Sequence, residues 1–181
     1  MASILRFDNW QNSDGTSIAT TDASGNISFA GAGAGKILQV VSTTKTDHFT
    51  TTGTGVDITG MSVTLTPSSI DSKVLILVML SLGSQTSTGA TIFLNRGGTN
   101  IAVGTGGSSI NAPLFARFAT YNTNIDDHSI VHLDSPATTS ATTYKLVMNT
   151  EPPGSTIYVN RRYQDAVVGT VSSITALEVS A

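Results

Sequence analysis

Short segments in which apolar and polar residues alternate recur from about residue 36 onward, and turn-forming residues separate them. Such turns are Thr-Pro-Ser-Ser at 66–69, Arg-Gly-Gly-Thr at 96–99 and Pro-Pro-Gly at 152–154. Alternation with a period of two predicts β-strands, whereas an amphipathic helix needs apolar residues at i, i+3, i+4 and i+7. No stretch keeps the helical pattern over three turns. The spacing therefore predicts an all-β protein.

The alternating segments, together with one uninterrupted apolar run, define where we expect the strands. They are 37–42, 48–52, 63–66, 73–82, 90–95, 101–103, 114–121, 129–133, 143–148, 156–160 and 173–179. About 145 residues in short strands of this kind suit a two-sheet, jelly-roll-like β-sandwich.

The segment Lys73–Leu82 differs from the others because its residues do not alternate. A strand that is apolar on both sides needs cover on both sides. In an all-β domain we expect one side to face the core and the other to face a neighbouring subunit.

Composition supports strands and excludes several classes of protein. Thr (28) and Ser (22) dominate the polar residues, and only 12% of residues are charged, against roughly 25% in an average domain. Residues of this kind favour strands and turns over helices. A helical bundle, a coiled coil and a basic nucleic-acid-binding protein are thereby excluded, the last because the net charge is −3. The absence of cysteine excludes disulfides and thiolate metal sites.

The chain divides near residue 35. Residues 1–35 are rich in Gly, Ser and Thr and too poor in apolar residues to form a core of their own, so we expect an N-terminal anchor and a thin stalk here. Residues 36–181 form the expected β-sandwich head. The start of the chain lacks a basic, then apolar signal sequence, and the run Val74–Leu80 is far shorter than the roughly 20 residues of a membrane helix. We expect no secretion signal and no membrane insertion.

Four apolar residues near the N-terminus form the candidate anchor: Ile4, Leu5, Phe7 and Trp10. Aromatic residues dominate the centres of protein interfaces. We therefore expect these side chains to insert into another protein. The alternative is that they fold back on the head.

Metal and phosphate sites are not expected. His128 and His132 would share one side of a strand about 13 Å apart, too far for one ion, although single histidines from three subunits could meet on a symmetry axis. Residues 31–36, Gly-Ala-Gly-Ala-Gly-Lys, lack the first glycine and the Ser or Thr of a phosphate-binding loop. We interpret them as a flexible joint, and we expect no metal and no cofactor.

Arg161, Arg162 and Tyr163 form a basic–aromatic group near Pro152-Pro-Gly. It could contact an anionic or sugar surface, although a solvated loop or a subunit contact is the ordinary interpretation. Five arginines in the whole chain do not suit nucleic-acid binding. No Gly-x-Ser-x-Gly elbow and no paired carboxylates are present, so we do not expect an enzyme.

The chain resembles structural proteins of tailed phages, most closely those of marine and cyanobacterial viruses. Seven segments carry the resemblance: Met-Ala-Ser-Ile-Leu-Arg (1–6), Gly-Lys-Ile-Leu-Gln-Val-Val (35–41), Met-Ser-Val-Thr-Leu-Thr-Pro-Ser-Ser-Ile-Asp-Ser-Lys-Val-Leu-Ile (61–76), Leu-Asn-Arg-Gly-Gly-Thr (94–99), Asp-Ser-Pro (134–136), Ala-Thr-Thr-Tyr-Lys-Leu (141–146) and Ser-Ser-Ile-Thr (172–175). In addition, Ser-Ser-Ile-Thr-Ala-Leu-Glu-Val at 172–179 resembles the closing strand of trimeric heads of the tumour-necrosis-factor/C1q type.

The phage resemblance implies a virion component that is assembled in the host cytoplasm and released without a signal peptide. A fibre or spike would be a homotrimer bound to other virion proteins of the tail or capsid, with a head that contacts a host surface glycan or protein. The main alternative is a decoration or head fibre on the capsid. A carbohydrate-active enzyme or a free lectin is a further alternative. None of the quoted segments is a catalytic motif, so no site residues follow from the resemblance.

Overall fold

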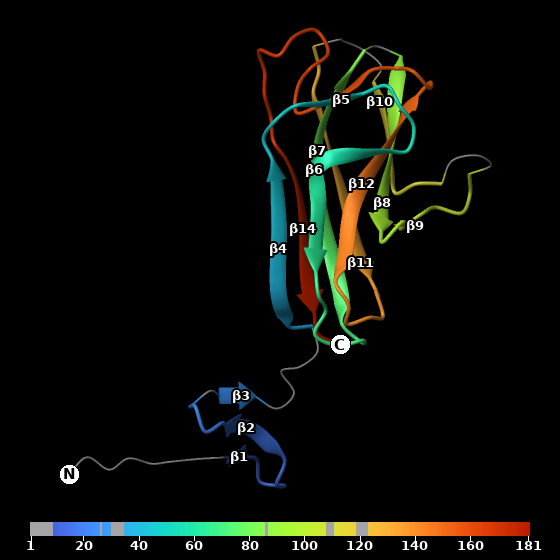
Figure 1. Ribbon diagram of the computed structural model, residues 1–181. Coiled ribbons are helices and arrows are strands. Elements are labelled where there is room, and N and C mark those ends of the chain that lie inside the picture. The colour runs from blue at the N-terminus through green and yellow to red at the C-terminus, as the bar shows by residue number, and fades with distance from the viewer. Residues whose placement is uncertain (1–8, 26, 30–34, 86, 108–110, 119–122) are drawn as a thin grey trace.

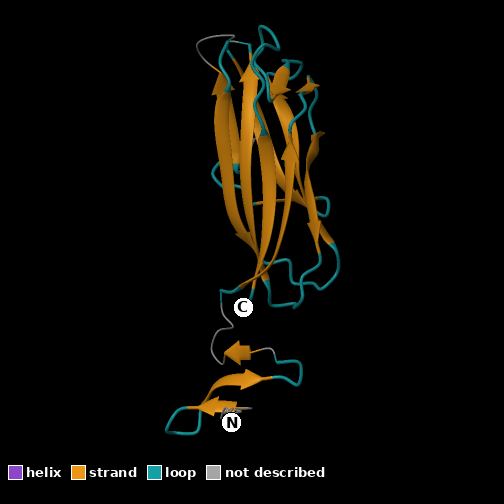
Figure 2. Ribbon diagram, turned by 90° about the vertical axis from the view of Figure 1, so that its left-hand side faces the viewer, coloured by secondary structure: helices purple, strands orange, loops and turns teal. Residues whose placement is uncertain are grey.

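The computed structural model describes residues 9–25, 27–29, 35–85, 87–107, 111–118 and 123–181, and within these ranges all regular structure is β (Figures 1 and 2). The strands are β1 (Asn9–Gln11), β2 (Ser17–Thr21), β3 (Ile27–Phe29), β4 (Ile37–Lys45), β5 (Phe49–Thr51), β6 (Val56–Leu65), β7 (Lys73–Ser84), β8 (Thr88–Arg96), β9 (Thr99–Ile101), β10 (Leu114–Phe118), β11 (Asp126–Asp134), β12 (Thr142–Glu151), β13 (Ile157–Val159) and β14 (Ser172–Val179). The prediction of an all-β chain is confirmed. No helix in the described ranges has the length and hydrophobicity needed to span a membrane.

Eleven strands form two antiparallel sheets that pack face to face as a sandwich. One sheet has the order β10-β8-β12-β6, with β9 paired to β8. The other has the order β4-β14-β7-β13-β5. In it, β14 pairs with residues 73–79 of β7 and β13 with residues 82–84, whereas β11 pairs with residues 74–82 along the other edge of β7. We call the second one the β7 sheet. The predicted sandwich is thus confirmed, while the jelly-roll connectivity stays a prediction.

The core lies between the inner faces of the two sheets. Its members are aliphatic residues and a few larger side chains, which alternate with outward residues along strands such as β11, β12 and β14. The largest fully buried ones include Met61, Leu80, Ile92, Tyr144 and Met148. The alternation predicted from the sequence therefore sets which face of each strand is buried.

Several strands extend beyond their predicted bounds, and β6 does so most. β6 begins at Val56 rather than at residue 63. Gly60 has a φ of +82°, and the pairing of β6 with β12 shifts register opposite Lys145–Val147. A glycine at such a bulge interrupts the alternation without ending the strand. The alternating pattern therefore did not indicate that residues 56–62 belong to β6.

The N-terminal residues form a separate small sheet. β1, β2 and β3 pair in that order as an antiparallel meander. Tight turns with positive φ at Gly15 and Gly25 connect its strands. Local turns thus let this polar stretch satisfy backbone hydrogen bonds within the small sheet. The N-terminal anchor and stalk stay a prediction. The residue-35 boundary itself stays a prediction.

The sandwich has two ends with different neighbours. The small sheet and the C-terminus lie at the same end, which we call the proximal end (Figure 1). Here the backbones of Gly35 and Lys36 exchange hydrogen bonds with Ser180. The β7–β8 and β12–β13 connections lie at the opposite, distal end (Figure 1).

Candidate functional site

The distal end carries the predicted basic–aromatic group, in a more specific arrangement than the sequence indicated. The guanidinium of Arg161 lies over the ring of Tyr158, with 4.6 Å between Cζ and the ring centroid. Tyr163 contacts the same ring edge-on at 5.9 Å between centroids. We call these three half-buried residues the distal cluster. Tyr158 had not been predicted, because nothing but its position three residues before Arg161 marks it in the sequence.

Arg161 is held in place by its own loop. Its Nε donates to the carbonyl oxygen of Arg162 at 3.1 Å, and its Nη2 donates to that of Tyr163 at 3.5 Å. Two fixed aromatic rings and one oriented cation form a surface that suits a sugar ring or an anionic group, since aromatic faces bind apolar sugar faces and cations.

Arg162 does not join the cluster. Its Nε and Nη2 donate to the two carboxylate oxygens of Asp165 at 2.6 and 2.9 Å. The hydrogen bonds from Arg162, followed by one from the backbone N–H of Val167, lower the pKa of Asp165. The charge of Arg162 is thereby paired within the loop.

Two backbone features hold the arginine-containing segment against the β7 sheet. Gly83 lies beneath it, and a Cβ at this position would come within 2.2 Å of the carbonyl oxygen of Arg161. Asn160, just before the arginines, has a φ of +63° and is fully buried. Left-handed backbone favours Gly and Asn, so the local sequence suits the sharp turn that leads into the cluster.

Of the predicted anchor, Ile4, Leu5 and Phe7 lie outside the described residues. Trp10 lies in β1, opposite Ala19 of β2, and 63% of its surface is exposed. Its ring is available to a partner, as the anchor hypothesis requires.

The two histidines lie on β11, whose pairing with β7 places them opposite Leu80 and Ile76. They thus share the side of the strand that faces the sandwich interior. The ring of His128 packs edge-on against Phe118 at 6.4 Å. Burial lowers the pKa of His128, although the nearby carboxylates of Asp126 and Asp127 oppose that shift.

Within the described ranges no group of three potential metal ligands occurs. Residues 31–34 of the predicted flexible joint lie outside those ranges. Gly35 and Lys36 use their backbone groups in pairing with Ser180.

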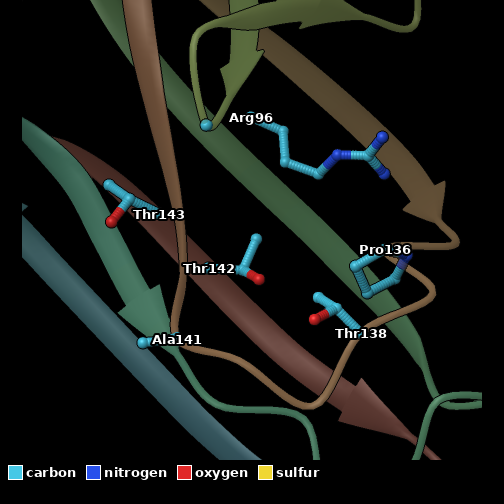
Figure 3. Close-up of a pocket in the computed structure, with 7 residues that line it drawn as sticks. Arg96, Pro136, Thr138, Ala141, Thr142 and Thr143 are labelled. Carbon is cyan, nitrogen blue, oxygen red and sulfur yellow. The ribbon is translucent and has the colours of Figure 1, made fainter.

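A pocket of about 350 Å³ lies at the proximal end (Figure 3). It is lined by Arg96, Gly97, Pro136, Thr138, Ala141, Thr142 and Thr143. Figure 3 shows that its residues come from the end of β8, the β11–β12 connection and the start of β12. Three threonines and Arg96 supply its polar side chains.

The one cationic side chain that lines this pocket, Arg96, already forms an ion pair. Nη1 of Arg96 donates to both oxygens of Asp134 at 2.8 Å and to the carbonyl oxygen of Ser135 at 3.2 Å. The hydroxyl of Tyr144 donates to the same carboxylate at 2.7 Å. Burial, followed by this hydrogen bond, raises the pKa of Tyr144 far above its ordinary value. The network is therefore a structural tie between the two sheets rather than a reactive group.

Comparison with known proteins gives distant likenesses only. No protein-family model matches the chain, and no curated protein matches its sequence. Among solved structures, a chain of infectious bursal disease virus Gt strain is 18% identical with a TM-score of 0.38, over 86% of this chain and 44% of that one. A chain of the Gx strain is 17% identical with a TM-score of 0.39, over 79% and 37%.

A third match is the VP2 subviral particle of the same virus, 18% identical with a TM-score of 0.31, over 79% of this chain and 38% of that one. The chain thus spans less than half the length of each of these viral chains. At TM-scores below 0.5 the likeness does not define a shared fold.

Proposed function

We propose that this protein is a structural component of a virus particle, and specifically a homotrimeric fibre or spike of a tailed phage. The chain attaches to the particle through its N-terminal residues and presents the sandwich as a head. It acts by binding and assembly rather than by catalysis. The proposal begins from the sequence resemblance, which extends over most of the chain.

The observation that carries the proposal is the separation of two binding surfaces at opposite ends of the molecule. The exposed Trp10 lies in the small sheet beyond the proximal end, whereas the distal cluster lies at the other end (Figure 1). β7, which has 12 residues, runs between these ends, and a strand of that length spans about 40 Å. A protein that is anchored at one end and contacts a surface at the other needs this arrangement.

The residue types at each end of the molecule suit the contact that we propose there. An exposed tryptophan is a typical anchor at a protein interface. The distal cluster presents two tyrosine rings and a guanidinium, which suit a glycan or a charged group on a host surface.

The proposal is tested on purified virus particles. Quantitative mass spectrometry gives the number of copies per particle, and antibody labelling in electron micrographs gives their position. A few dozen copies or fewer at the tail support the fibre. Scores to hundreds of copies spread over the shell would instead support a capsid decoration, and absence from the particle would overturn a virion role altogether.

A further inference from the structure

The β7 sheet orients its charged and apolar side chains in an unusual way. Lys45 of β4, Glu178 of β14 and Asp134 of β11 all point inward and are buried, at 3%, 1% and 6% exposure. In an antiparallel sheet with one solvated face, charged residues normally point outward and aliphatic residues inward. Here the strand residues of the outward face are nearly free of charge: the two charged ones, Lys73 and Asp127, lie at its opposite ends.

The outward face carries aliphatic side chains on four strands, continuous across the sheet in one row and bordered by Ser and Thr at further positions of β4 and β14. Its members alternate with the buried core residues along each strand, and we call them the outer aliphatic face: Ile37 and Val40 of β4, Leu75, Leu77 and Met79 of β7, Val131 and Leu133 of β11, and Leu177 and Val179 of β14. Exposure reaches 57% at Val40 and 70% at Val131. Isolated exposed aliphatic residues are ordinary, but a contiguous field of this kind marks an interface.

Strand pairing places these residues in register. Val40 pairs with Leu177, Leu177 with Leu75, and Leu75 with Leu133. The four side chains therefore form one row across the sheet. Val40 stands at one edge of that row and Leu133 at the other.

We propose that this face binds further copies of the same chain, three of which pack around an axis parallel to the strands with their outer aliphatic faces turned inward. The proposal rests on the trimeric form of the proposed function. A ligand with charged groups would find no partners at the centre of the face, whereas a second copy presents the same uncharged aliphatic surface.

The dimensions of the face suit three copies. Four strands at a spacing of about 4.8 Å give a width of about 19 Å, and three such faces enclose a triangle whose centre lies about 5.5 Å from each sheet. Packed sheets stand about 10 Å apart, so each contributes about 5 Å of side chain. Three faces of four strands therefore fill the enclosed space with their own side chains.

The face is also large enough for a stable contact. The outward face as a whole, with the Ser and Thr positions that border the aliphatic ones, is nine residues of strand high. At about 3.4 Å per residue this gives a height of about 31 Å and a projected area of roughly 600 Å². The accessible surface of a corrugated face exceeds its projection, and a standard interface buries about 800 Å² per partner.

The direction of the axis follows from the N-terminal attachment. Rotation about an axis parallel to the strands keeps all three N-terminal segments at the proximal end, as a common anchor requires. A two-fold axis that runs across the strands would send two N-termini to opposite ends. In the three-fold arrangement, Val40 of one copy lies beside Leu133 of the next at each corner, because both belong to the same row.

Cysteine cross-linking tests this arrangement directly, because the natural chain contains no cysteine. The full-length double variant Val40→Cys/Leu133→Cys is oxidised and separated on a non-reducing gel. Within one chain the two positions lie three strand spacings apart, about 14 Å, beyond the roughly 7 Å limit between Cα atoms of a disulfide. Every bond formed between them must therefore join different copies.

We expect covalent species that stop at three chains. Each single variant alone should give no trimer, and the pair Val40→Cys/Val167→Cys, with its second cysteine in the distal loop, controls for random collision. Cross-links that end at two chains would overturn the three-fold arrangement, and the absence of cross-links would overturn the corner contact.

A second measurement does not depend on disulfide geometry. Val131→Lys places a charge in the outer aliphatic face at a side chain that is 70% exposed in the single chain, and Val167→Lys makes the same change in the distal loop at 81% exposure. We expect sedimentation to show folded monomers for Val131→Lys, with trimer affinity reduced at least about 100-fold by the buried charge. Val167→Lys should stay trimeric.

The outcomes separate this proposal from the proposed function. A Val131→Lys variant that stays trimeric would overturn the assignment of the face but leave the virion role intact. A wild-type chain that is monomeric at micromolar concentration would overturn the face and the trimer together. Whether the chain is present in virus particles is measured separately from the aliphatic face and the trimer.

Discussion

The hydroxyl of Tyr144 donates a 2.7 Å hydrogen bond to Oδ2 of Asp134, and both groups are buried between the two sheets. Tyr144 lies on β12 of one sheet, whereas Asp134 ends β11 of the other. Because Arg96 of β8 binds the same carboxylate, this one acceptor connects the sheets at the proximal end.

Tyr144→Phe removes the hydroxyl and leaves the ring in place. We expect the free energy of unfolding to fall by about 1.5–3 kcal/mol, the range for a hydrogen bond to a charged group. Urea denaturation measures the change. Tyr158→Phe is the matched control, because within the described residues its hydroxyl makes no hydrogen bond, and its cost should stay below about 0.5 kcal/mol. Equal costs for the two variants would contradict the role of the Tyr144–Asp134 bond.

The stability of the head should depend on pH through Glu178. Burial opposes ionisation of this carboxylate, but hydrogen bonds from the hydroxyl and backbone N–H of Ser68 and from Gln39 outweigh it and lower its pKa from 4.5 to about 2. A lowered folded-state pKa stabilises the fold above pH 4.5, and that contribution is lost as the pH falls toward 2.

Glu178→Gln isolates this contribution. Above pH 5 we expect the wild type to be more stable than the variant by about 1–3 kcal/mol, and the difference should shrink below pH 4.5 and close near pH 2. Denaturant titrations of both proteins across this range measure the difference. A gap that persists unchanged to pH 2 would show that the charge of Glu178 is not its source.

The distal cluster depends on the absence of a side chain at position 83. Gly83→Ala would place a Cβ against the carbonyl oxygen of Arg161, which is backbone and cannot rotate away. We expect a loss of about 1–3 kcal/mol, the usual cost of overpacking, together with displacement of the arginine-containing segment. Thermal denaturation and the near-ultraviolet circular dichroism of Tyr158 and Tyr163 report the two effects.

Gly106→Ala is the control for that substitution. A Cβ at position 106 has no atom within 4 Å, and its backbone does not require glycine. We expect no measurable loss of stability. A Gly83→Ala protein as stable as Gly106→Ala would contradict the close packing of residues 161–163 on the β7 sheet.

If the distal cluster contacts the host surface, Arg161 and the neighbouring Arg162 should contribute unequally. Arg161→Ala removes the cation over the Tyr158 ring, and we expect binding of the labelled full chain to host cells to fall about 10- to 150-fold, corresponding to the loss of one charge-assisted hydrogen bond to the host surface of roughly 1.5–3 kcal/mol. Arg162→Ala should change binding less than about 3-fold, because Asp165 already pairs that charge. Equal losses would show that net charge, rather than the cluster, governs binding.

Sequence reasoning reached the β-sandwich and the alternation of its strands, because period-two patterns depend only on neighbouring residues. It also predicted that Lys73–Leu82 needs cover on both sides; the structure places Leu77 and Met79 of this segment on the outer aliphatic face, and the second cover stays a prediction. It did not find Tyr158 or the paired state of Arg162. These depend on contacts set by Gly83 and by the loop after β13, and no local pattern records such contacts.

Asn160 is fully buried, and its side-chain amide makes three hydrogen bonds. Its Nδ2 donates to the carbonyl oxygens of Lys45 and Asp47 at 2.9 and 3.0 Å, and its Oδ1 accepts from the hydroxyl of Ser172 at 2.6 Å. The amide thus joins β4 and β14 to the turn after β13. Few other side chains could satisfy all three groups and also adopt a φ of +63°.

Two substitutions separate the backbone contribution of Asn160 from that of its side chain. Asn160→Gly keeps the left-handed backbone and loses the hydrogen bonds, so we expect a loss of about 2–4 kcal/mol from the unpaired buried groups. Asn160→Ala adds the strain of an alanine at positive φ, roughly 1 kcal/mol more. Urea denaturation of both variants measures the order. An alanine variant more stable than the glycine variant would show that the turn relaxes out of the left-handed conformation once the amide is gone.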